Sequence, residues 1–456
     1  MERHGMQITE GVIWKQLLKF FFPILLGAFF QQMYNTVDTI IVGRFVGTQA
    51  LAAVGSTSAL VNLINGFFIG LSTGSSVVIS QFYGAGDRSG VKRSMTTNAV
   101  LALILGVLAM LVGISCSPKL LRLIKTPESC LEDAIRYATV YFSGAAATVI
   151  YNMGSGILRA MGDSKRPLYF LIITCFTNIV LDVLFVVVWK QGIEGVAIAT
   201  VLSQYISALL VVIALCRLPG DISLTLGKFS VDPALLQRVL LIGFPAGLQF
   251  ITFDLSNLLV QSGINSFGDV TVAAWAAYFK ADSITWMVSG AFGVAITTFV
   301  GQNFGAQKYR RIRQSVWVCL GMSIATQLLI SIVTLAFREF ILGIFTTDME
   351  VIRVGAYAML WIVPFNALFM FIEVFAGAMR GTGYSVVPTV ITGSCVCLFR
   401  ILWVLLMVSH WHTIEMLCIA YPLSWVIASI VFFIVYLRGT WLHKRIEICG
   451  MTSEQV

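Results

Sequence analysis

Long apolar stretches alternate with short polar segments along the whole chain. We predict that the apolar stretches form twelve membrane-spanning helices, over residues 15–43, 51–82, 93–117, 131–160, 167–189, 193–216, 237–266, 270–303, 314–345, 351–380, 386–409 and 413–437. Several exceed the about 20 residues that a bilayer requires, so we expect tilt or extension beyond the membrane. Lipid offers no water to the backbone, and the stretches are too long for barrel strands. The predicted fold class is therefore all-α and integral to the membrane.

The second half of the chain repeats the first with a shift of 221 residues. Matching positions include Gln81–Ala85 with Gln302–Ala306, and Arg159, Gly162 and Pro167 with Arg380, Gly383 and Pro388. A duplication in so apolar a chain is typical of transporters built from two matching bundles with a pathway between them. We predict two six-helix lobes related by pseudo-two-fold symmetry, residues 12–217 and 237–440, joined by a cytoplasmic linker at 218–236.

Composition and charge agree with a membrane location. Hydrophobic residues make up 58% of the chain and charged residues 11%, against roughly 45–50% and about 25% in soluble proteins. If the N-terminus is cytoplasmic, 20 of the 30 basic residues lie on the inner side and eight on the outer side. This bias predicts that both termini are cytoplasmic. It also explains the net charge of +8, so a nucleic-acid partner need not be invoked.

The sequence has no motif for common enzymatic chemistry. It contains neither HExxH nor GxSxG, and it has no phosphate-binding Gly-Lys-Ser loop. His410 and His412 stand at a predicted helix end without a third metal ligand nearby in sequence. We expect no enzyme activity and no cofactor. Because nothing points to ATP hydrolysis, active transport would use an ion gradient.

Two acids lie deep in the predicted helices of the first half, Asp38 and Asp182, and no Lys or Arg lies deep there. An ionisable residue within a spanning helix is costly unless it is paired, so each acid is a functional candidate. Asn178 precedes Asp182 by four residues, which places both on one helix face. Gln31 and Tyr34 share a face with Asp38 for the same reason. We expect the two acids to bind a proton or a metal cation.

Counting from the predicted outer loops places Asp38, Asp182 and Thr200 at one depth, roughly 10 Å below the outer boundary. A common depth is what one shared site requires. The alternative is that each acid only hydrogen-bonds a neighbouring helix. At the 221-residue shift, the matching positions carry no acid: Leu259 or Val260 for Asp38, Phe399 for Asn178, Trp403 for Asp182 and Tyr421 for Thr200. Repetition of the fold therefore does not account for the acids.

The predicted helices of the second half carry a different set of charges. The acids are Asp254, Asp282 and Glu373, and the bases are Lys280 and Arg400. Pairing between them would absorb much of this charge, so a structural network and a functional one both stay open. Glu373 matches Asn152 at the repeat shift, and we expect both to face a central cavity.

Several motifs resemble those of the multidrug and toxic compound extrusion (MATE) transporters, and in particular their DinF-like branch. They are Pro23 with Gln31–Asp38, the segment Gly154–Asp163, and the segment Asn178–Asp182. The resemblance covers about residues 12–440. It implies that Asp38, Asn178, Asp182 and Thr200 act as cation ligands or proton acceptors, with Na⁺ held by Asp38 and Asp182. It also implies that Gln31, Tyr34, Tyr137 and Asn152 are polar groups of the cavity.

These observations lead to a hypothesis for the whole chain. We expect a monomeric antiporter in the cytoplasmic (inner) membrane of a bacterium. It would export small organic, often cationic and amphipathic compounds in exchange for H⁺ or Na⁺ by alternating access. The alternative within transport is a lipid-linked saccharide flippase of the same superfamily, which would need a larger basic cavity. A membrane receptor and a membrane-embedded enzyme are alternatives from other classes.

Overall fold

The computed structural model describes residues 8–124, 126–225, 227 and 230–448. These residues are almost entirely helical, and none of them forms a strand. The described chain divides into two compact units. The first unit contains residue 8 and residues 19–247, and the second contains residues 9–18 and 248–448. The division falls inside one helix, whereas the lobes predicted from the repeat end at a linker, and those lobe limits stay a prediction.

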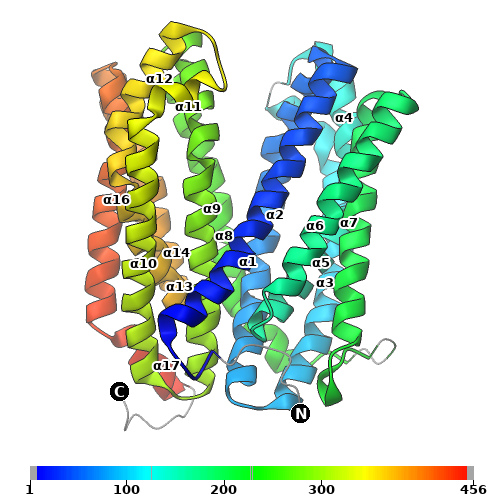
Figure 1. Cartoon of the computed structure of the whole chain (residues 1–456), viewed down its shortest axis with the longest axis vertical. Coiled ribbons are helices and arrows are strands. Elements are labelled where there is room, and N and C mark those ends of the chain that lie inside the picture. Colours follow the sequence, from blue (N-terminus) through cyan, green and yellow to red (C-terminus); the bar gives the residue numbers. More distant parts are fainter. Residues whose placement is uncertain (1–7, 125, 226, 228–229, 449–456) are drawn as a thin grey trace. The chain divides into compact units, whose positions relative to one another are not determined.

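The first unit contains most of the first repeat (Figure 1). Its elements are α1 (Ile13–Ile41, whose first residues belong to the second unit), η1 (Val42–Val46), α2 (Thr48–Gly84), α3 (Arg88–Leu123), α4 (Glu128–Ser143), α5 (Ala145–Ala160), α6 (Lys165–Asp182), η2 (Val183–Val188), α7 (Gly192–Cys216), η3 (Gly220–Ile222) and the first half of α8 (Pro233–Asn265). Helices α2, α3, α4 and α5 pack on one another, α7 packs on α4 and α5, and these helices enclose the hydrophobic core of this unit.

The second unit begins within α8 and contains the second repeat. Its further elements are α9 (Asp269–Gly305), α10 (Tyr309–Ala336), α11 (Arg338–Gly343), α12 (Met349–Ile362), η4 (Val363–Phe365), α13 (Asn366–Gly381), α14 (Val386–Ile391), η5 (Thr392–Leu398), α15 (Phe399–Trp403), η6 (Val404–Val408), α16 (Ile414–Leu437) and α17 (Thr440–Ile448). Helix α13 packs between α9, α10 and α16.

The bounds of the helices reproduce the repeat seen in the sequence. Helices α2 and α9 are both 37 residues long and begin 221 positions apart, and the same shift relates the 16-residue helices α5 and α13. Gly47 precedes α2 with φ +124° and Gly268 precedes α9 with φ +89°. A positive φ is open to glycine because it has no Cβ. In both repeats, therefore, a glycine with positive φ directly precedes this helix.

Two of the predicted spanning helices are broken in the middle. The stretch predicted at 131–160 consists of α4 and α5, which meet at Gly144. The stretch predicted at 351–380 consists of α12 and α13, joined by the 3₁₀ turn η4 that contains Pro364. Eleven helices in the described part of the chain are long and apolar enough to span a membrane, and the pair α4–α5 supplies the twelfth predicted span. The predicted all-α membrane fold class with a duplicated six-helix plan is confirmed.

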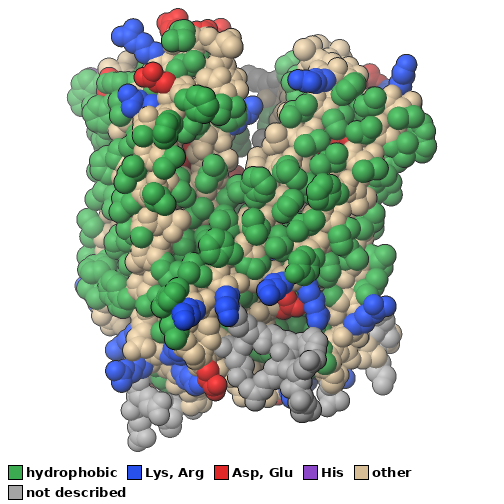
Figure 2. All heavy atoms as spheres, in the orientation of Figure 1, with side chains coloured by type: hydrophobic (Ala, Val, Ile, Leu, Met, Phe, Trp, Pro, Cys, Tyr) green, Lys and Arg blue, Asp and Glu red, His purple; other side chains and the backbone are tan. Residues whose placement is uncertain are grey.

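Apolar side chains cover the outer faces of the helices. On α3, for example, Leu103, Ile104, Leu108 and Leu111 are each half exposed, while Gly106 and Gly113 face the core. Figure 2 shows hydrophobic side chains along the helices of both units, with Lys and Arg gathered toward their ends. A soluble protein does not expose this much apolar surface, so these faces are in contact with lipid.

Helices α2 and α8 approach each other closely in the first unit through glycines. A Cβ added at Gly70 would overlap the backbone at Gly247, and one added at Gly74 would overlap the backbone at Gly243. Small residues let helix backbones come together in a membrane, where van der Waals packing replaces the hydrophobic driving force. This crossing therefore depends on the absence of side chains.

Candidate functional site

The two deep acids of the first unit occupy equivalent positions on their helices. Asp38 lies in the last turn of α1, directly before the π-helical segment η1, and Asp182 is the last residue of α6, directly before the π-helical segment η2. Helix α7, which carries Thr200, packs against both π-helical segments. π-Helical turns are rare and occur often at functional sites. The backbone thus brings the two acids and Thr200 to one place.

The side chains of Asp38, Asn178, Asp182 and Thr200 form one buried cluster. Their exposed fractions are 8%, 1%, 0% and 4%. The Thr200 hydroxyl donates to Asp38 Oδ2 at 3.4 Å and to the Val196 carbonyl at 3.0 Å. The carboxyl of Asp38 also lies within interaction range of the side chains of Asp182 and Asn178. The structure therefore brings together the four residues singled out in the sequence as a cation or proton site.

The cluster has excess hydrogen-bonding capacity. Asp38 Oδ1, both carboxyl oxygens of Asp182 and both amide atoms of Asn178 are buried without a hydrogen-bond partner in the described part of the chain. None of the salt bridges between described residues includes Asp38 or Asp182. Two buried carboxyl groups this close cannot both stay ionised without a cation. Carboxylate, amide and hydroxyl oxygens fit a hard cation such as Na⁺, and a carboxyl also holds a proton.

Tyrosine rings from α1 and α4 adjoin the acidic cluster. Tyr34 and the buried Tyr137 both lie within electrostatic range of Asp38. Tyr137 stacks on Tyr141 with ring centroids 6.1 Å apart, and Asn65 of α2 donates to the Tyr141 hydroxyl at 3.2 Å. Tyr34 and Tyr137, predicted as cavity groups, therefore stand beside the acids.

Three polar residues near the acidic cluster were missed in the sequence analysis: Asn65, Tyr141 and Gln204. Gln204 is buried and adjoins Tyr141. Its spacing of four residues from Thr200 was a usable signal, because residues four apart share a helix face. Tyr141 follows Tyr137 by the same spacing. Asn65 gave no such signal, since the contact between α2 and α4 comes from tertiary packing.

The other two predicted cavity residues are not among the side chains in contact with the acids. Gln31 lies two turns before Asp38 on α1 and is exposed, and Asn152 lies half-buried on α5. Neither contributes to the electrostatic surroundings of Asp38 or Asp182. Their role in a cavity stays a prediction.

The acids and bases singled out in the second half form no salt bridges with one another among the described residues. Glu373 pairs with Arg380, seven residues later on α13, at 2.9 Å. Gln249 Oε1 accepts a further bond from Arg380 at 3.5 Å. Arg380 was not among the second-half bases singled out in the sequence. Two turns of helix place residues i and i+7 on one face, so the side chains meet.

The two bases of the second half, Lys280 and Arg400, contact aromatic rings and form no salt bridge with the described acids. Lys280 is exposed on α9, with its ammonium group 6.0 Å from the ring centroid of Phe345. Arg400 is buried, donates from Nε to Ser424 at 2.9 Å, and lies 4.4 Å from the ring centroid of Tyr421. Neither base forms a salt bridge with a described acid, and Asp254 is half-buried on α8. Asp254, Lys280, Asp282 and Arg400 therefore form no salt bridge with one another among the described residues, and their role as a charge network stays a prediction.

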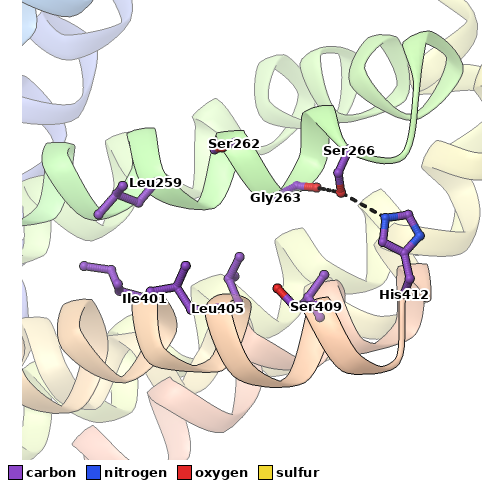
Figure 3. Close-up of a pocket in the computed structure, with 10 residues that line it drawn as sticks. Leu259, Ser262, Gly263, Ser266, Ile401, Leu405, Ser409 and His412 are labelled. Atoms are coloured by element: carbon purple, nitrogen blue, oxygen red, sulfur yellow. Dashed lines mark hydrogen bonds between the residues drawn. The ribbon is translucent and has the colours of Figure 1, made fainter.

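The second unit also has an apolar groove of 410 Å³ between α8 and the segment that ends in η6 (Figure 3). Leu259, Ile401 and Leu405 line it, and it ends at His412, whose Nε2 lies 3.0 Å from the Ser266 hydroxyl. The ring of His412 also stacks on that of Phe267, with the ring centroids 4.1 Å apart. The lining of the groove is thus mostly aliphatic, its polar side chains are three serines and His412, and it includes no acid.

Two segments of the chain, residues 23–184 and 245–406, match the MatE family model, one in each repeat. The chain belongs to the MatE family. The MatE segments include Asp38, Asn178 and Asp182 in the first repeat, and Asp282 and Glu373 in the second. This MatE protein is a multi-pass membrane transporter, with the acidic cluster inside its first matched segment.

The MatE chain is similar along nearly its full length to bacterial proteins. The probable multidrug resistance protein YoeA of Bacillus subtilis is 30% identical over 453 residues, which cover 96% of each chain. The probable multidrug resistance protein YpnP of the same organism is 29% identical over 441 residues, covering 96% of this chain and 98% of the relative. The probable multidrug resistance protein NorM of Thermotoga maritima is 26% identical over 461 residues, which cover 97% of this chain and 95% of the relative.

Solved MatE-like structures share the fold. An outward-facing multidrug resistance MATE family transporter of the MOP superfamily matches with a TM-score of 0.89 at 24% identity, covering 97% of this chain and 100% of that one. A MOP superfamily transporter from Pyrococcus furiosus matches with a TM-score of 0.90 at 23% identity, covering 97% and 99%. These matches support the helical plan described above.

Proposed function

We propose that this transporter is a secondary antiporter that exports organic, often cationic and amphipathic compounds in exchange for inward H⁺ or Na⁺. The observation that carries the proposal is the buried cluster of Asp38 and Asp182, which has oxygen-bearing neighbours and no salt-bridge partner among the described residues. The names of the relatives, several of which are probable multidrug resistance proteins, favour the same class of substrate.

Coupling follows from the charge of the cluster. With a proton or Na⁺ bound, Asp38 and Asp182 lose most of their net charge, so burying the cluster in an apolar bundle costs little free energy. Without it, the carboxylates repel each other and attract any cation in reach. A conformation that admits a cationic substrate is then favoured when the coupling ion has left. A ligand shifts such an equilibrium by its differential affinity for the two states.

Competition for the acidic cluster would give exchange. Tyr34 and Tyr137 offer aromatic faces beside the carboxyl groups, and such faces attract organic cations. Gln31 and Asn152 would line the pathway farther from the acids. Glu373 would act in a cavity only together with Arg380, because the two are paired.

The remaining parts of the proposal follow from charge and composition. We place the protein in the cytoplasmic (inner) membrane of a bacterium, with both termini cytoplasmic, as a monomer that needs no cofactor besides its coupling ion and catalyses no chemical reaction. A lipid-linked saccharide flippase would need a basic cavity. Of the two bases within the predicted helices of the second half, Lys280 is exposed and Arg400 is enclosed by aromatic rings.

The test uses purified protein in liposomes loaded with a fluorescent cationic dye. A proton gradient and a sodium gradient are imposed separately, and dye release is followed over time. We expect one of the two gradients to drive release and the same gradient to be dissipated by added dye. Release that ignores both gradients would contradict antiport, and transport of lipid-linked saccharide without dye release would favour the flippase.

A further inference from the structure

A second buried carboxyl group, in the second unit, is held by neutral donors from two helices. Asp282 of α9 is 4% exposed. Asn366, the first residue of α13, donates from Nδ2 to Asp282 Oδ1 at 3.0 Å, and the hydroxyl of Tyr278 donates to Oδ2 at 3.5 Å. No salt bridge between described residues reaches this carboxyl group. Its charge is therefore balanced by hydrogen bonds alone.

Further oxygen atoms stand beside Asp282. Thr285, one turn later on α9, accepts at its hydroxyl from Gln327 Nε2 of α10 at 3.1 Å and from Asn366 Nδ2 at 3.5 Å. Gln327 is 0% exposed, and its Oε1 has no hydrogen-bond partner in the described part of the chain. A buried carbonyl oxygen without a donor is costly. Carboxylate, hydroxyl and amide oxygens in one place suit a hard monovalent cation.

The repeat shows that the scaffold does not need this cluster. At the 221-residue shift, the positions of Asp282, Thr285, Gln327 and Asn366 are occupied by Val61, Ile64, Gly106 and Ala145. Helices α2, α3 and α5 of the first repeat adopt the corresponding fold with these apolar and small residues. The polar cluster is thus specific to the second repeat, as the Asp38 cluster is to the first.

The cluster also holds the joint between α12 and α13. Asn366 directly follows η4, the turn that contains Pro364 and separates the two helices. On the other side of the joint, Ser331 of α10 donates to the Val363 carbonyl at 3.1 Å. A cation bound by Asp282 competes with the Asn366 amide for the same carboxyl oxygen. Loading would therefore weaken one of the bonds that fix this joint.

Few titratable groups face Asp282. On α9 it is faced by Tyr278, and on α16 the hydroxyl of Tyr421 lies within its electrostatic range. Arg400 of α15 lies within electrostatic range of both tyrosines and forms no salt bridge with a described acid. The residues that bond to Asp282 from α13 and to Thr285 from α10 are neutral amides. Proton uptake at this cluster would therefore be assigned to the carboxyl group.

We propose that Asp282, with Thr285 and Gln327, is a second binding site for an inorganic monovalent cation, H⁺ or Na⁺, and that its loading displaces the amide donor of Asn366 and so releases the joint between α12 and α13. This inference extends the proposed antiport, because the bound ion would be a second coupling ion. The binding itself is testable without transport.

The experiment counts cations bound by the purified full-length protein in detergent. Equilibrium binding of radioactive sodium is measured at mildly alkaline pH, and proton uptake on acidification is measured without sodium. Asp282→Asn is compared with Asp38→Asn and with Asp269→Asn, a matched change at an exposed position on the same helix. We expect Asp282→Asn to lose one of two bound sodium ions, or one proton of uptake if the ion is H⁺, and Asp269→Asn to lose neither.

Two neutral variants keep the carboxyl group and separate the ions. Gln327→Leu should weaken sodium binding at this site about tenfold and leave proton uptake unchanged. Asn366→Leu removes a donor to the ionised carboxyl group, so it should move proton uptake to higher pH. These two variants also test the proposal if Asp282→Asn does not fold. If sodium binding and proton uptake are both unchanged in Gln327→Leu and in Asn366→Leu, the proposal is wrong.

The outcomes distinguish this site from the first. If Asp282→Asn binds as many sodium ions and protons as Asp269→Asn while Asp38→Asn loses one, the second site is wrong and the proposed antiport is untouched. If only Asp282→Asn loses a cation, the second site stands and the assignment of coupling to the first unit fails.

Discussion

Breaking the Glu373–Arg380 pair should destabilise the protein strongly, because the pair is nearly enclosed. The side chains are 19% and 9% exposed, and their charged atoms are 2.9 Å apart. At an effective dielectric constant of about 20, the attraction at this distance is about 6 kcal/mol, part of which offsets desolvation. In Glu373→Met, the polar contact that Arg380 keeps within the described part of the chain is the one with Gln249 at 3.5 Å. We expect a loss of about 3 kcal/mol, since a buried guanidinium group is left without its counter-charge.

The assay is thermal unfolding of the purified protein in detergent, followed by size-exclusion chromatography after heating. The double variant Glu373→Met with Arg380→Met should regain most of the lost stability, because neither charge remains. Glu132→Met is the matched control. Its pair with Arg136 has a similar distance of 2.7 Å, but the side chains are 80% and 56% exposed, so no measurable change is expected. Wild-type stability of the Glu373→Met variant, or a double variant no better than the single one, would refute the reasoning.

Three further predictions concern packing, topology and the neutral ligands. Gly74→Ala should lower thermal stability by about 1–3 kcal/mol because a Cβ there overlaps the backbone of α8, whereas Gly55→Ala on the same helix meets open space and should not. A cysteine introduced as Ser223→Cys should resist a membrane-impermeant thiol reagent added outside intact cells, and labelling there would contradict cytoplasmic placement. Asn178→Ala and Thr200→Ala should each slow gradient-driven dye efflux only partly, because each removes one neutral ligand and keeps both acids. Complete loss with either one would contradict a carboxylate-centred site.

Helix positions followed from the apolar pattern because a bilayer imposes a minimum length on every span. The stretch predicted at 193–216 is observed as Gly192–Cys216, and that predicted at 413–437 as Ile414–Leu437. The breaks at Gly144 and in η4 were not predicted. Both interrupt stretches that stay apolar, and the tertiary packing that fixes such a break leaves no mark on hydropathy. Pro364 was a local signal for the second break, since proline removes a backbone donor.

The acidic cluster of the first unit could be predicted because its residues lie on single helix faces at countable depths. The partners of the second-unit charges could not. Arg380 satisfies Glu373 from two turns away on the same helix, and Lys280 lies on the exposed side of α9. The sequence does not tell which face of so apolar a helix is covered, because lipid-facing and core-facing positions carry the same side chains.

The most direct test of the account is dye efflux from proteoliposomes containing Asp38→Asn or Asp182→Asn protein, under the gradient that drives the wild type. An amide keeps the shape of the carboxyl group but neither binds a proton at neutral pH nor balances the charge of Na⁺. Folding should survive, since removing an unpaired buried charge relieves desolvation. The account predicts that both variants reach the membrane, unfold at or above the wild-type temperature, and show no gradient-driven efflux. Efflux at the wild-type rate in both variants would contradict the central claim and move coupling to other acids.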